Sequence, residues 1–293
     1  MLLSIITATY NRGYCLGKIY ESILKNNLIS DVEWIIVDDG SVDNTTSLVQ
    51  SWINEAKINI RYFKKSNGGK TSAIFHGFSQ QPQGKFTVVL DSDDFLAESF
   101  ITIVNKETLS LNDNLIGIIG LKSYTNGKVV GDKFTYKHID YITLYFGKDK
   151  IIGDKLFVIR TELYKNSYAL PYLGEKFLPD NIPYIKLNNI GKYKLINEIF
   201  YYGDYLEDGM TNNVKKMAIN NINGYILEKK LLQKEIKYFP NLIINEIKYL
   251  YYSFHSGKKN KEIISFSNST FLSILLFLPA LFLFWYLKIF RNN

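Results

Sequence analysis

Cysteine is almost absent from this chain, since Cys15 is the one such residue among 293. A single thiol excludes an internal disulfide, gives no support for a structural zinc site and is typical of a reducing compartment. Histidine is also scarce, and His76, His138 and His255 stand isolated in the sequence. A lone histidine is more often a structural or surface residue, so we assign a catalytic or metal-binding role to none of them.

Other absences narrow the class of protein further. We expect no signal peptide, because the opening MLLSIITATYNRG has neither a basic region nor a long apolar one. The chain shows no internal repeat and no low-complexity linker. Because 46% of the residues are hydrophobic, we expect a folded core and not a disordered chain. A length of 293 residues predicts one large domain, or one domain with an appendage.

Positive charge is in excess, and the formal net charge is +7. Such an excess is typical of proteins that bind nucleic acid, an anionic membrane or a phosphorylated ligand. The basic residues are scattered, except for Lys258, Lys259 and Lys261, which stand just before an apolar tail. This placement favours an anionic membrane surface as a partner, and we predict no nucleic-acid partner.

The apolar tail FLSILLFLPALFLFWYL, residues 271–287, has no charged side chain. A transmembrane helix needs about 20 residues, with about 17 as the lower limit, so the tail is just long enough. Trp285, Tyr286 and Lys288 are typical of a membrane interface. A buried core helix is the alternative. Pro279 leaves open whether the segment spans the membrane or dips in and returns.

Strand and helix signals alternate over the first hundred residues. The predicted strands are 3–10, 32–40, 58–63 and 84–94, and the predicted helices between them are 14–26, 41–56 and 70–81. This alternation predicts parallel strands joined by right-handed crossovers, and hence a doubly wound α/β sheet. Later strands are predicted at 115–121, 155–160 and 193–202, and later helices at 212–237 and 241–254.

Polar side chains follow each of the first four predicted strands. Ligands of open parallel sheets bind beyond the carboxyl ends of the strands. The four polar groups should therefore lie along one rim, and they are residues 10–12, 38–41, 64–70 and 91–94.

Two of these groups are acidic, and one contains the D-x-D pair Asp91 and Asp93. Hard cations such as Mg²⁺ and Mn²⁺ prefer carboxylate oxygen and commonly keep phosphates as further ligands. An acidic turn that only caps a helix is the alternative. The position at the rim and the second acidic pair, Asp38 and Asp39, favour a metal.

Four segments together resemble one enzyme family. SIITATYNR, WIIVDDGSVDNT, NGGKTSAIFHG and VVLDSDDFL occur in the order and at the intervals of inverting family 2 glycosyltransferases with the GT-A fold, over roughly residues 2–110. The later GEKFLPDNIPY and YYGDYLEDGMT look like segments of bacterial capsule and cell-wall members. The resemblance implies a GT-A-like doubly wound mixed sheet with flanking helices, plus a C-terminal helical and apolar membrane-associating segment.

The resemblance also implies a domain organisation. Residues 1–211 would form the transferase domain, with a donor half of about 1–110 and an acceptor half of about 111–211. A helical extension, 212–262, and the apolar tail, 263–293, would follow.

Each matching residue takes a role from the resemblance. Ala8, where family members often have Pro, and Tyr10 would contact the nucleotide. Asp38 or Asp39, with Asp39 preferred, would accept a hydrogen bond from the base. A carboxylate that accepts from an imide N–H favours uracil, and therefore a UDP-sugar donor.

The remaining donor-side roles concern the sugar-phosphate part of the nucleotide and the cation. Asn67, Gly69 and Lys70 would lie near the ribose and phosphates. Asp91 would lie on the ribose side, and Asp93 would hold Mn²⁺ or Mg²⁺.

Inverting transfer also needs a base that takes the proton of the acceptor hydroxyl. The matching residue is Asp180 in FLPDNIPY, and Glu175 is the alternative. Many family members have Glu, or Glu followed by Asp, at this place. The acceptor side is assigned to YYGDYLEDGMT through Tyr205, Asp208 and Gly209, with a plain surface turn as the alternative.

The sequence thus predicts a glycosyltransferase enzyme of the hexosyltransferase class. It would move a sugar from a nucleotide donor to a lipid-linked or glycan acceptor, with inversion, at the cytoplasmic face of the cell membrane. A sugar nucleotidyltransferase is one alternative, although TATYNRG is not a Gly-rich basic loop. A catalytically inactive, membrane-associated sugar-binding protein is another, although the acid set is intact.

Overall fold

The computed structural model describes residues 1–205 and 214–290. Within these residues the strands form one nine-stranded sheet in the order β3-β2-β1-β4-β8-β6-β9-β5, and β7 pairs with β9. The strands are β1 (Leu3–Thr9), β2 (Val32–Asp38), β3 (Asn59–Lys64), β4 (Phe86–Val89), β5 (Phe95–Leu96), β6 (Leu115–Ser123), β7 (His138–Ile139), β8 (Lys155–Arg160) and β9 (Lys192–Tyr202).

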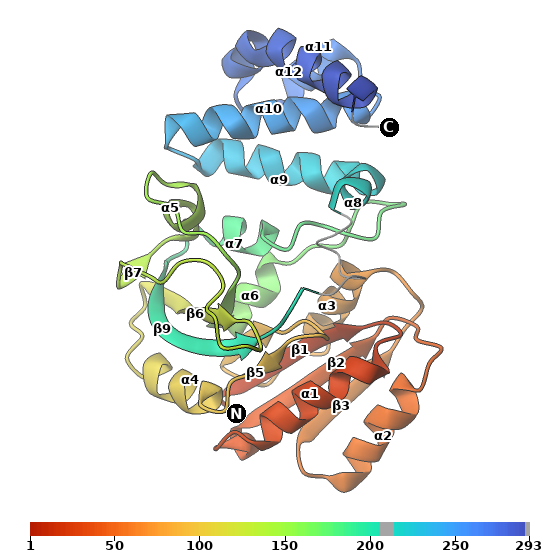
Figure 1. The fold of residues 1–293 in the computed structure, drawn as a ribbon, viewed down its shortest axis with the longest axis vertical. Helices are drawn as coiled ribbons and strands as arrows, with labels where there is room; N and C mark the ends of the chain where they lie inside the picture. Colours follow the sequence, from red (N-terminus) through yellow and green to blue (C-terminus); the bar gives the residue numbers. More distant parts are fainter. Residues whose placement is uncertain (206–213, 291–293) are drawn as a thin grey trace.

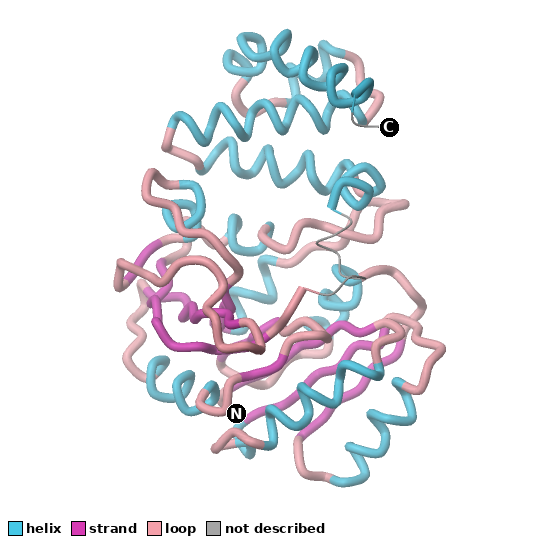
Figure 2. Tube along the Cα trace, viewed as in Figure 1, coloured by secondary structure: helices cyan, strands magenta, loops and turns pink. Residues whose placement is uncertain are grey.

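The helices flank the sheet and extend beyond one end of it (Figures 1 and 2). They are α1 (Gly13–Leu24), α2 (Thr45–Glu55), α3 (Lys70–Ser79), α4 (Phe100–Thr108), α5 (Tyr141–Phe146), α6 (Thr161–Ser167), α7 (Ile182–Lys186), α8 (Val214–Asn220), α9 (Ile222–Glu235), α10 (Phe239–His255), α11 (Asn260–Phe266) and α12 (Thr270–Phe290), with a short 3₁₀ turn at Ile29–Asp31.

The first four long strands are parallel, as the alternation of signals predicts. β1 pairs with β2 on one side and with β4 on the other, and β2 pairs with β3. β2 is buried along its whole length, because helices cover both faces of the sheet. Leu3 and Ile5 belong to one core with α1, α2 and α4, and Ile6 belongs to a second core with α3 and α6. This alternation confirms the doubly wound arrangement.

The second half of the sheet is mixed, which confirms the predicted fold class. β8 is antiparallel to both β4 and β6, and β9 is parallel to β6. The strand predicted over 84–94 is shorter than expected, since β4 ends at Val89. Residues 91–94 form a turn in which the Asp94 N–H donates to the Asp91 carbonyl at 3.2 Å. This turn carries the acidic side chains out of the sheet.

The helices after β9 stack at the end of the molecule opposite to α1 and α2 (Figure 1). α9 joins them to the sheet, because its Leu232 belongs to the same buried core as α3. In the described residues, the helix predicted over 212–237 is two helices that meet at Asn221. The Asn221 carboxamide oxygen accepts the N–H groups of Lys176 and Phe177 at 2.8 and 2.9 Å, so this residue holds a neighbouring loop.

The last helix meets the length and composition expected of a membrane span. Thr270–Lys288 is the one candidate among the described residues, and 22% of that window is buried. The buried side chains of α12 pack against α10, in a cluster that joins Ala280 to Tyr249 and Leu250. The division into domains at 211 and 262 stays a prediction.

Candidate active site

A cavity of about 660 Å³ lies beyond the carboxyl ends of the parallel strands. Tyr10 follows β1, Asp39 follows β2, Lys70 follows β3 and Asp91 follows β4, and all four line this cavity. The structure therefore brings together side chains from all four predicted polar groups. Ala8, Asp93, Asp180 and Tyr205 also line it.

Lys70 joins two of the predicted carboxylates. Its ammonium lies 2.8 Å from Asp91 and 2.9 Å from Asp180, and its side chain is 19% exposed. The side chains of Asp91 and Asp180 are 44% and 50% exposed, so both remain open to a ligand in the cavity. One cation thus sits between a donor-side carboxylate and the candidate base.

The two carboxylates around Lys70 differ in their proton affinity. The surrounding cavity walls keep water from part of the Asp180 carboxyl and raise its pKa, although half of the side chain is exposed, and the charge of Asp91 adds to this effect. Lys70 opposes the rise without reversing it. At Asp91 burial also raises the pKa, but the charge and hydrogen bond of Lys70, with the charges of Lys122 and Arg12, together outweigh it, and the pKa lies below its usual range. A carboxylate with a raised pKa is the better proton acceptor of the two.

Gly69 supplies the backbone that places Lys70 at the start of α3. Its φ of +90° is one that L side chains rarely adopt. A Cβ there would lie 2.0 Å from the Lys176 carbonyl oxygen, so the loop and residue 176 are in direct contact. The Lys176 ammonium also donates to the Asn67 carboxamide at 2.8 Å. Asn67 and Gly69 therefore fasten the loop and do not line the cavity.

The two aspartates after β2 have different surroundings. Asp39 accepts the Gly69 N–H at 2.7 Å and the Lys65 ammonium at 2.7 Å, and it lines the cavity. Asp38 is fully buried and does not line the cavity. It accepts the Ser41 N–H at 2.6 Å and the Tyr62 hydroxyl at 2.5 Å. Of the two, only Asp39 faces the cavity.

The two candidate bases, Glu175 and Asp180, have different contacts. Glu175 accepts the N–H groups of Asn223 and Gly224 at 2.7 and 3.1 Å, at the start of α9. These are the N–H groups that a helix leaves without internal partners. Glu175 does not line the cavity, whereas Asp180 does.

Arg12 is a site residue to which the sequence analysis gives no role. Its guanidinium donates to Asp93 at 2.8 Å, and both side chains are about one-fifth exposed, at 20% and 22%. The metal-binding candidate therefore already has a cationic partner. The signal in the sequence is only that Arg12 lies in the polar group after β1.

The opposite wall of the cavity holds a buried lysine that sequence reasoning missed. The Lys122 ammonium lies 3.2 Å from Asp94 and 5.2 Å from the ring centres of Tyr201 and Tyr205. Burial, and then the charge of Asp91, raise the pKa of Asp94 to about 7 although Lys122 opposes the shift. Lys122 ends the otherwise apolar run LIGIIGL of β6, which is the one hint in the sequence.

Aromatic side chains make up much of the remaining wall. Tyr184 stacks on Phe157 with ring centres 4.1 Å apart, and Tyr141 and Tyr145 lie nearby. Aromatic faces of this kind suit sugar rings. The Tyr205 hydroxyl donates to Asp154 at 2.9 Å. The other two predicted acceptor-side residues, Asp208 and Gly209, lie outside the described residues.

The described residues contain no group of three or more His, Cys, Asp or Glu that could hold a metal ion. Asp91 and Asp93 nevertheless both face the cavity and offer the hard oxygen donors that Mg²⁺ and Mn²⁺ prefer. Mg²⁺ is usually bound by one or two carboxylates together with substrate phosphates. The donor set therefore fits a divalent cation that arrives with a diphosphate.

The model of a protein family, described as Glycosyl transferase family 2, matches residues 4–166. An uncharacterized glycosyltransferase of Mycoplasma genitalium is 38% identical over 111 residues, which are 36% of this chain and 37% of that protein. The GalNAc(5)-diNAcBac-PP-undecaprenol beta-1,3-glucosyltransferase of Campylobacter jejuni is 25% identical over 80% of this chain and 75% of its own. The chain thus spans little more than a third of the Mycoplasma relative.

Two solved structures share the fold. The S. aureus TarS fragment 1–349 in complex with UDP-GlcNAc has a TM-score of 0.59 at 17% identity, over 96% of this chain and 88% of that one. A mannosyltransferase from Pyrobaculum calidifontis in complex with GDP-Man and Mn²⁺ has a TM-score of 0.57 at 15% identity, over 96% and 82%. At such identities the likeness shows the fold alone.

Proposed function

The chain belongs to glycosyl transferase family 2, and from this premise we propose that it transfers one sugar from a UDP-sugar donor to an acceptor hydroxyl with inversion. The observation that carries the proposal is the position of Lys70 between Asp91 and Asp180. This arrangement sets a donor-side carboxylate and a candidate base a single side chain apart in one cavity.

The donor would lie along the carboxyl ends of the strands. The nucleotide would lie against Ala8 and Tyr10, and Asp39 would accept the imide N–H of uracil, because it faces the cavity while Asp38 does not. Lys70 and Arg12 would turn toward the negatively charged diphosphate, which competes with Asp91 and Asp93 for these cations. The Asp91 carboxylate would then be free to meet the ribose.

Mg²⁺ or Mn²⁺, held by Asp93 with Asp91 nearby, would supply neutralisation of the charge on the leaving diphosphate. The P. calidifontis enzyme was solved with Mn²⁺, which supports this choice of cation. Arg12 forms an ion pair with Asp93 at 2.8 Å, and this pair would break when the donor and the cation bind.

Asp180 would take the proton from the acceptor hydroxyl. Its oxygen accepts this proton as the hydroxyl oxygen forms its bond to the anomeric carbon and the bond to the diphosphate breaks. The raised pKa of Asp180 suits this role. The departure of Lys70 toward the diphosphate would raise it further, so donor binding would prepare the base.

The acceptor would be a lipid-linked or polysaccharide glycan at the cytoplasmic membrane face. The aromatic wall of Tyr141, Tyr145 and Tyr184 supports a sugar acceptor. The undecaprenol named for the Campylobacter relative and the apolar α12 support a membrane location.

Donor turnover tests this function. Purified full-length protein with Mn²⁺ and a panel of nucleotide sugars should release the free sugar and UDP slowly without acceptor. Release of pyrophosphate would support the sugar nucleotidyltransferase instead. Binding of the donor without any turnover would support an inactive sugar-binding protein. A parallel thermal-shift panel should identify the donor, because a ligand that binds the folded state raises the melting temperature.

A further inference from the structure

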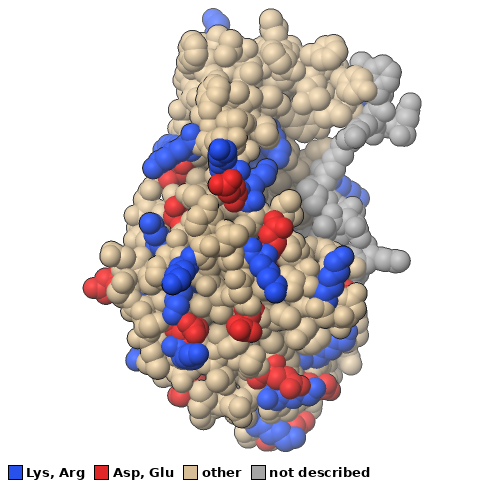
Figure 3. All heavy atoms as spheres, turned by 60° about the vertical axis from the view of Figure 1, so that its left-hand side comes forward, with Lys and Arg blue, Asp and Glu red and all other residues tan. Residues whose placement is uncertain are grey.

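The end of the molecule formed by α10, α11 and α12 has an apolar outer surface. Large apolar side chains of α12 are exposed there, from Phe271 at 79% through Leu278 at 74% to Phe282 at 75%. Figure 3 shows this end almost bare of charged side chains, with Lys and Arg gathered below it. Soluble proteins rarely expose a continuous apolar surface of this kind without a partner.

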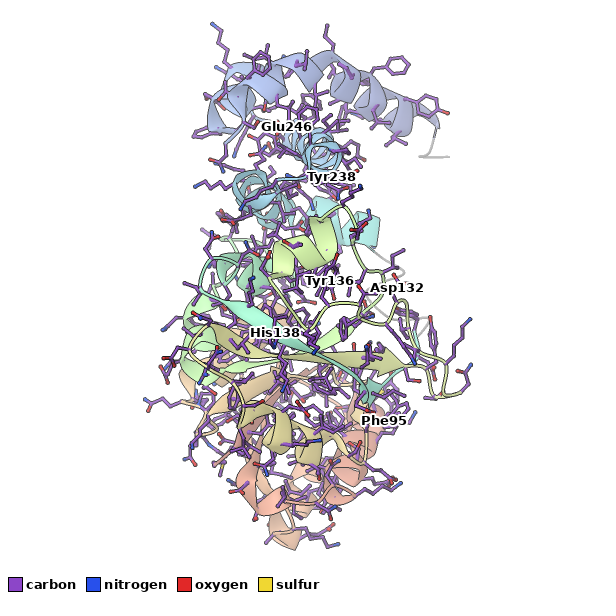
Figure 4. The ribbon with its side chains drawn as sticks, turned by 90° about the vertical axis from the view of Figure 1, so that its left-hand side faces the viewer. Phe95, Asp132, Tyr136, His138, Tyr238 and Glu246 are labelled. Atoms are coloured by element: carbon purple, nitrogen blue, oxygen red, sulfur yellow. The ribbon has the colours of Figure 1, made fainter. Side chains whose placement is uncertain are left out.

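The inner face of α12 is already occupied. Ala280 is fully buried, and Phe284 is 8% exposed where its ring packs on Tyr251 and Phe254 of α10. Ser273 is fully buried and its hydroxyl donates to Glu246 of α10. Figure 4 shows α12 running across the end of the molecule, with Glu246 beneath it.

These contacts decide how α12 can meet a bilayer. To cross the membrane, α12 would have to leave α10 or carry it into the hydrocarbon. Leaving would expose Leu250 and take the Ser273 hydroxyl away from Glu246. Carrying α10 inside would move the exposed Lys248 into the hydrocarbon, where a charged group is costly. The arrangement that keeps these contacts is one in which α12 lies along the membrane surface, with its outer apolar face toward the bilayer and its inner face on α10.

Beside the start of α12 there is a small basic cavity of about 140 Å³, lined by Lys230, Lys258 and Phe266. The ammonium groups of the two lysines lie 5.6 and 5.5 Å from the Phe266 ring centre. Neither forms an ion pair with a described residue. Burial, and then the charge of Lys258, lower the pKa of Lys230, as expected for cations held together without an anion.

The cavity is large enough for a phosphate group, and two of its lining residues are the cationic Lys230 and Lys258. Phe266 is 54% exposed and comes just before Thr270, where α12 begins. At the other end of α12 the Lys288 ammonium lies 5.0 Å from the Trp285 ring centre, another pairing suited to a membrane interface.

We propose that α12 lies flat on an anionic phospholipid bilayer and that the cavity between Lys230 and Lys258 binds a lipid phosphate. This inference rests on the membrane association in the proposed function and adds its geometry. The membrane then contacts the outer face of α12 while the inner face stays on α10. The chain would be anchored on one side of the bilayer and would not cross it.

Vesicle flotation of the full-length protein tests the phosphate site. Vesicles that contain phosphatidylglycerol should bind the protein much more strongly than pure phosphatidylcholine vesicles. The double variant Lys230→Gln/Lys258→Gln should weaken partition onto the anionic vesicles roughly thirtyfold, because each lysine near the surface contributes about fivefold. Lys25→Gln/Lys106→Gln, which removes an exposed charge just after α1 and another in α4, should leave partition within about twofold of the original chain. Equal binding by the two double variants would overturn the phosphate site.

The apolar face has its own variant. Leu278→Asp places a charge on the exposed side of α12, so flotation should be lost while the melting temperature in solution stays unchanged. Flotation that survives this change would show that the outer face is not the membrane contact.

Cysteine labelling tests the flat orientation. Cys15 is buried and can be replaced by Ala as a background, after which Lys288→Cys adds one exposed thiol near the end of α12. In cells stripped of their outer layers, a membrane-impermeant maleimide should label this thiol only after the cells are opened. Tyr136→Cys, in the sheet half, serves as the internal reference. Labelling of Lys288→Cys but not Tyr136→Cys in intact cells would mean that α12 crosses, which refutes the proposal.

Donor turnover by the same variants separates this inference from the proposed function. Lys230→Gln/Lys258→Gln should hydrolyse the UDP-sugar in solution at the original rate, because both lysines lie outside the catalytic cavity. If no variant and no original chain turned over any donor, the proposed function would fail and the vesicle results would still stand.

Discussion

The two ends of the molecule place their carboxylates in opposite surroundings. In the cavity beyond the strands, Asp91 and Asp180 share Lys70, and Asp93 pairs with Arg12. At the α12 end, Glu246 is fully buried and accepts hydrogen bonds from neutral groups, Gln233 at 2.6 Å among them.

The difference shows what each carboxylate can be used for. A carboxylate that faces a cavity beside a cation can exchange that cation for a ligand, so its charge is available for binding and chemistry. Burial raises the pKa of Glu246. Its carboxylate accepts a hydrogen bond from Ser273 of α12 and so holds α10 against α12. Buried polar contacts of this kind can fix which surfaces pack together. The carboxylates in the cavity are therefore candidates for binding and chemistry, whereas Glu246 has a structural role.

The largest expected effect comes from the candidate base. Asp180→Asn removes the proton acceptor and keeps the shape, so we expect kcat for transfer to fall by about a thousandfold. Affinity for UDP should stay within a few fold, as measured by calorimetry. Glu175→Gln is the matched control, because it changes a cap of α9 and should leave kcat near the original value. If the control lost turnover and Asp180→Asn kept it, the assignments would be reversed.

The cation site should respond next in size. Asp93→Asn removes a carboxylate oxygen donor, so the Mn²⁺ concentration that gives half-maximal donor turnover should rise by about a hundredfold. Chelation with EDTA should abolish turnover of the original chain, and added Mn²⁺ should restore it. Asp43→Asn is a suitable control, because Asp43 binds the N–H of Gly13 at 3.0 Å and does not line the cavity. Unchanged Mn²⁺ dependence in Asp93→Asn would remove this residue from the site.

The role of Lys70 can be read from the pH profile. A base works in its deprotonated form, so kcat/KM rises with pH through the pKa of Asp180. Lys70 lowers that pKa. In Lys70→Met the rise should therefore move to higher pH, with a loss of activity on the acid side of the profile. Lys65→Met, which frees Asp39 of its cation, should weaken donor binding without moving the rise. An unmoved rise in Lys70→Met would separate Lys70 from the base.

The smallest effect is expected at the helical end. The pKa of Glu246 is raised in the folded state, so its contribution to stability is present below about pH 4.3 and is lost as pH rises through the raised value. Glu246→Gln removes this loss, so its free energy of unfolding relative to the original chain should improve between pH 4.5 and pH 8. Urea unfolding at both pH values measures the change.

The exposed Glu98→Gln serves as the control for this prediction, because its side chain is 75% exposed and should show no such pH dependence. The same pH response in both variants would mean that burial of Glu246 is not its cause. Donor turnover should stay unchanged in Glu246→Gln, because Glu246 does not line the catalytic cavity.

The sequence predicted the first four long strands, because their signals are local. β1, β2 and β4 are apolar runs, each of the four strands is followed by polar residues, and the backbone direction of a parallel sheet then sends every such group to the same rim. The family resemblance and the mixed α/β fold class are confirmed. Lys122 escaped prediction because its partner, Asp94, is distant in sequence and the two meet only when β6 takes its place in the sheet.

By itself, the sequence determined the alternation of strands and helices, the family and the presence of an apolar final helix, since each depends on neighbouring residues along the chain. Only the tertiary structure decided which carboxylate faces the cavity and which caps a helix, because Asp180 and Glu175 differ in partners that come from α3 and α9. It also decided that one face of α12 is covered, because burial against α10 depends on contacts that no local pattern encodes.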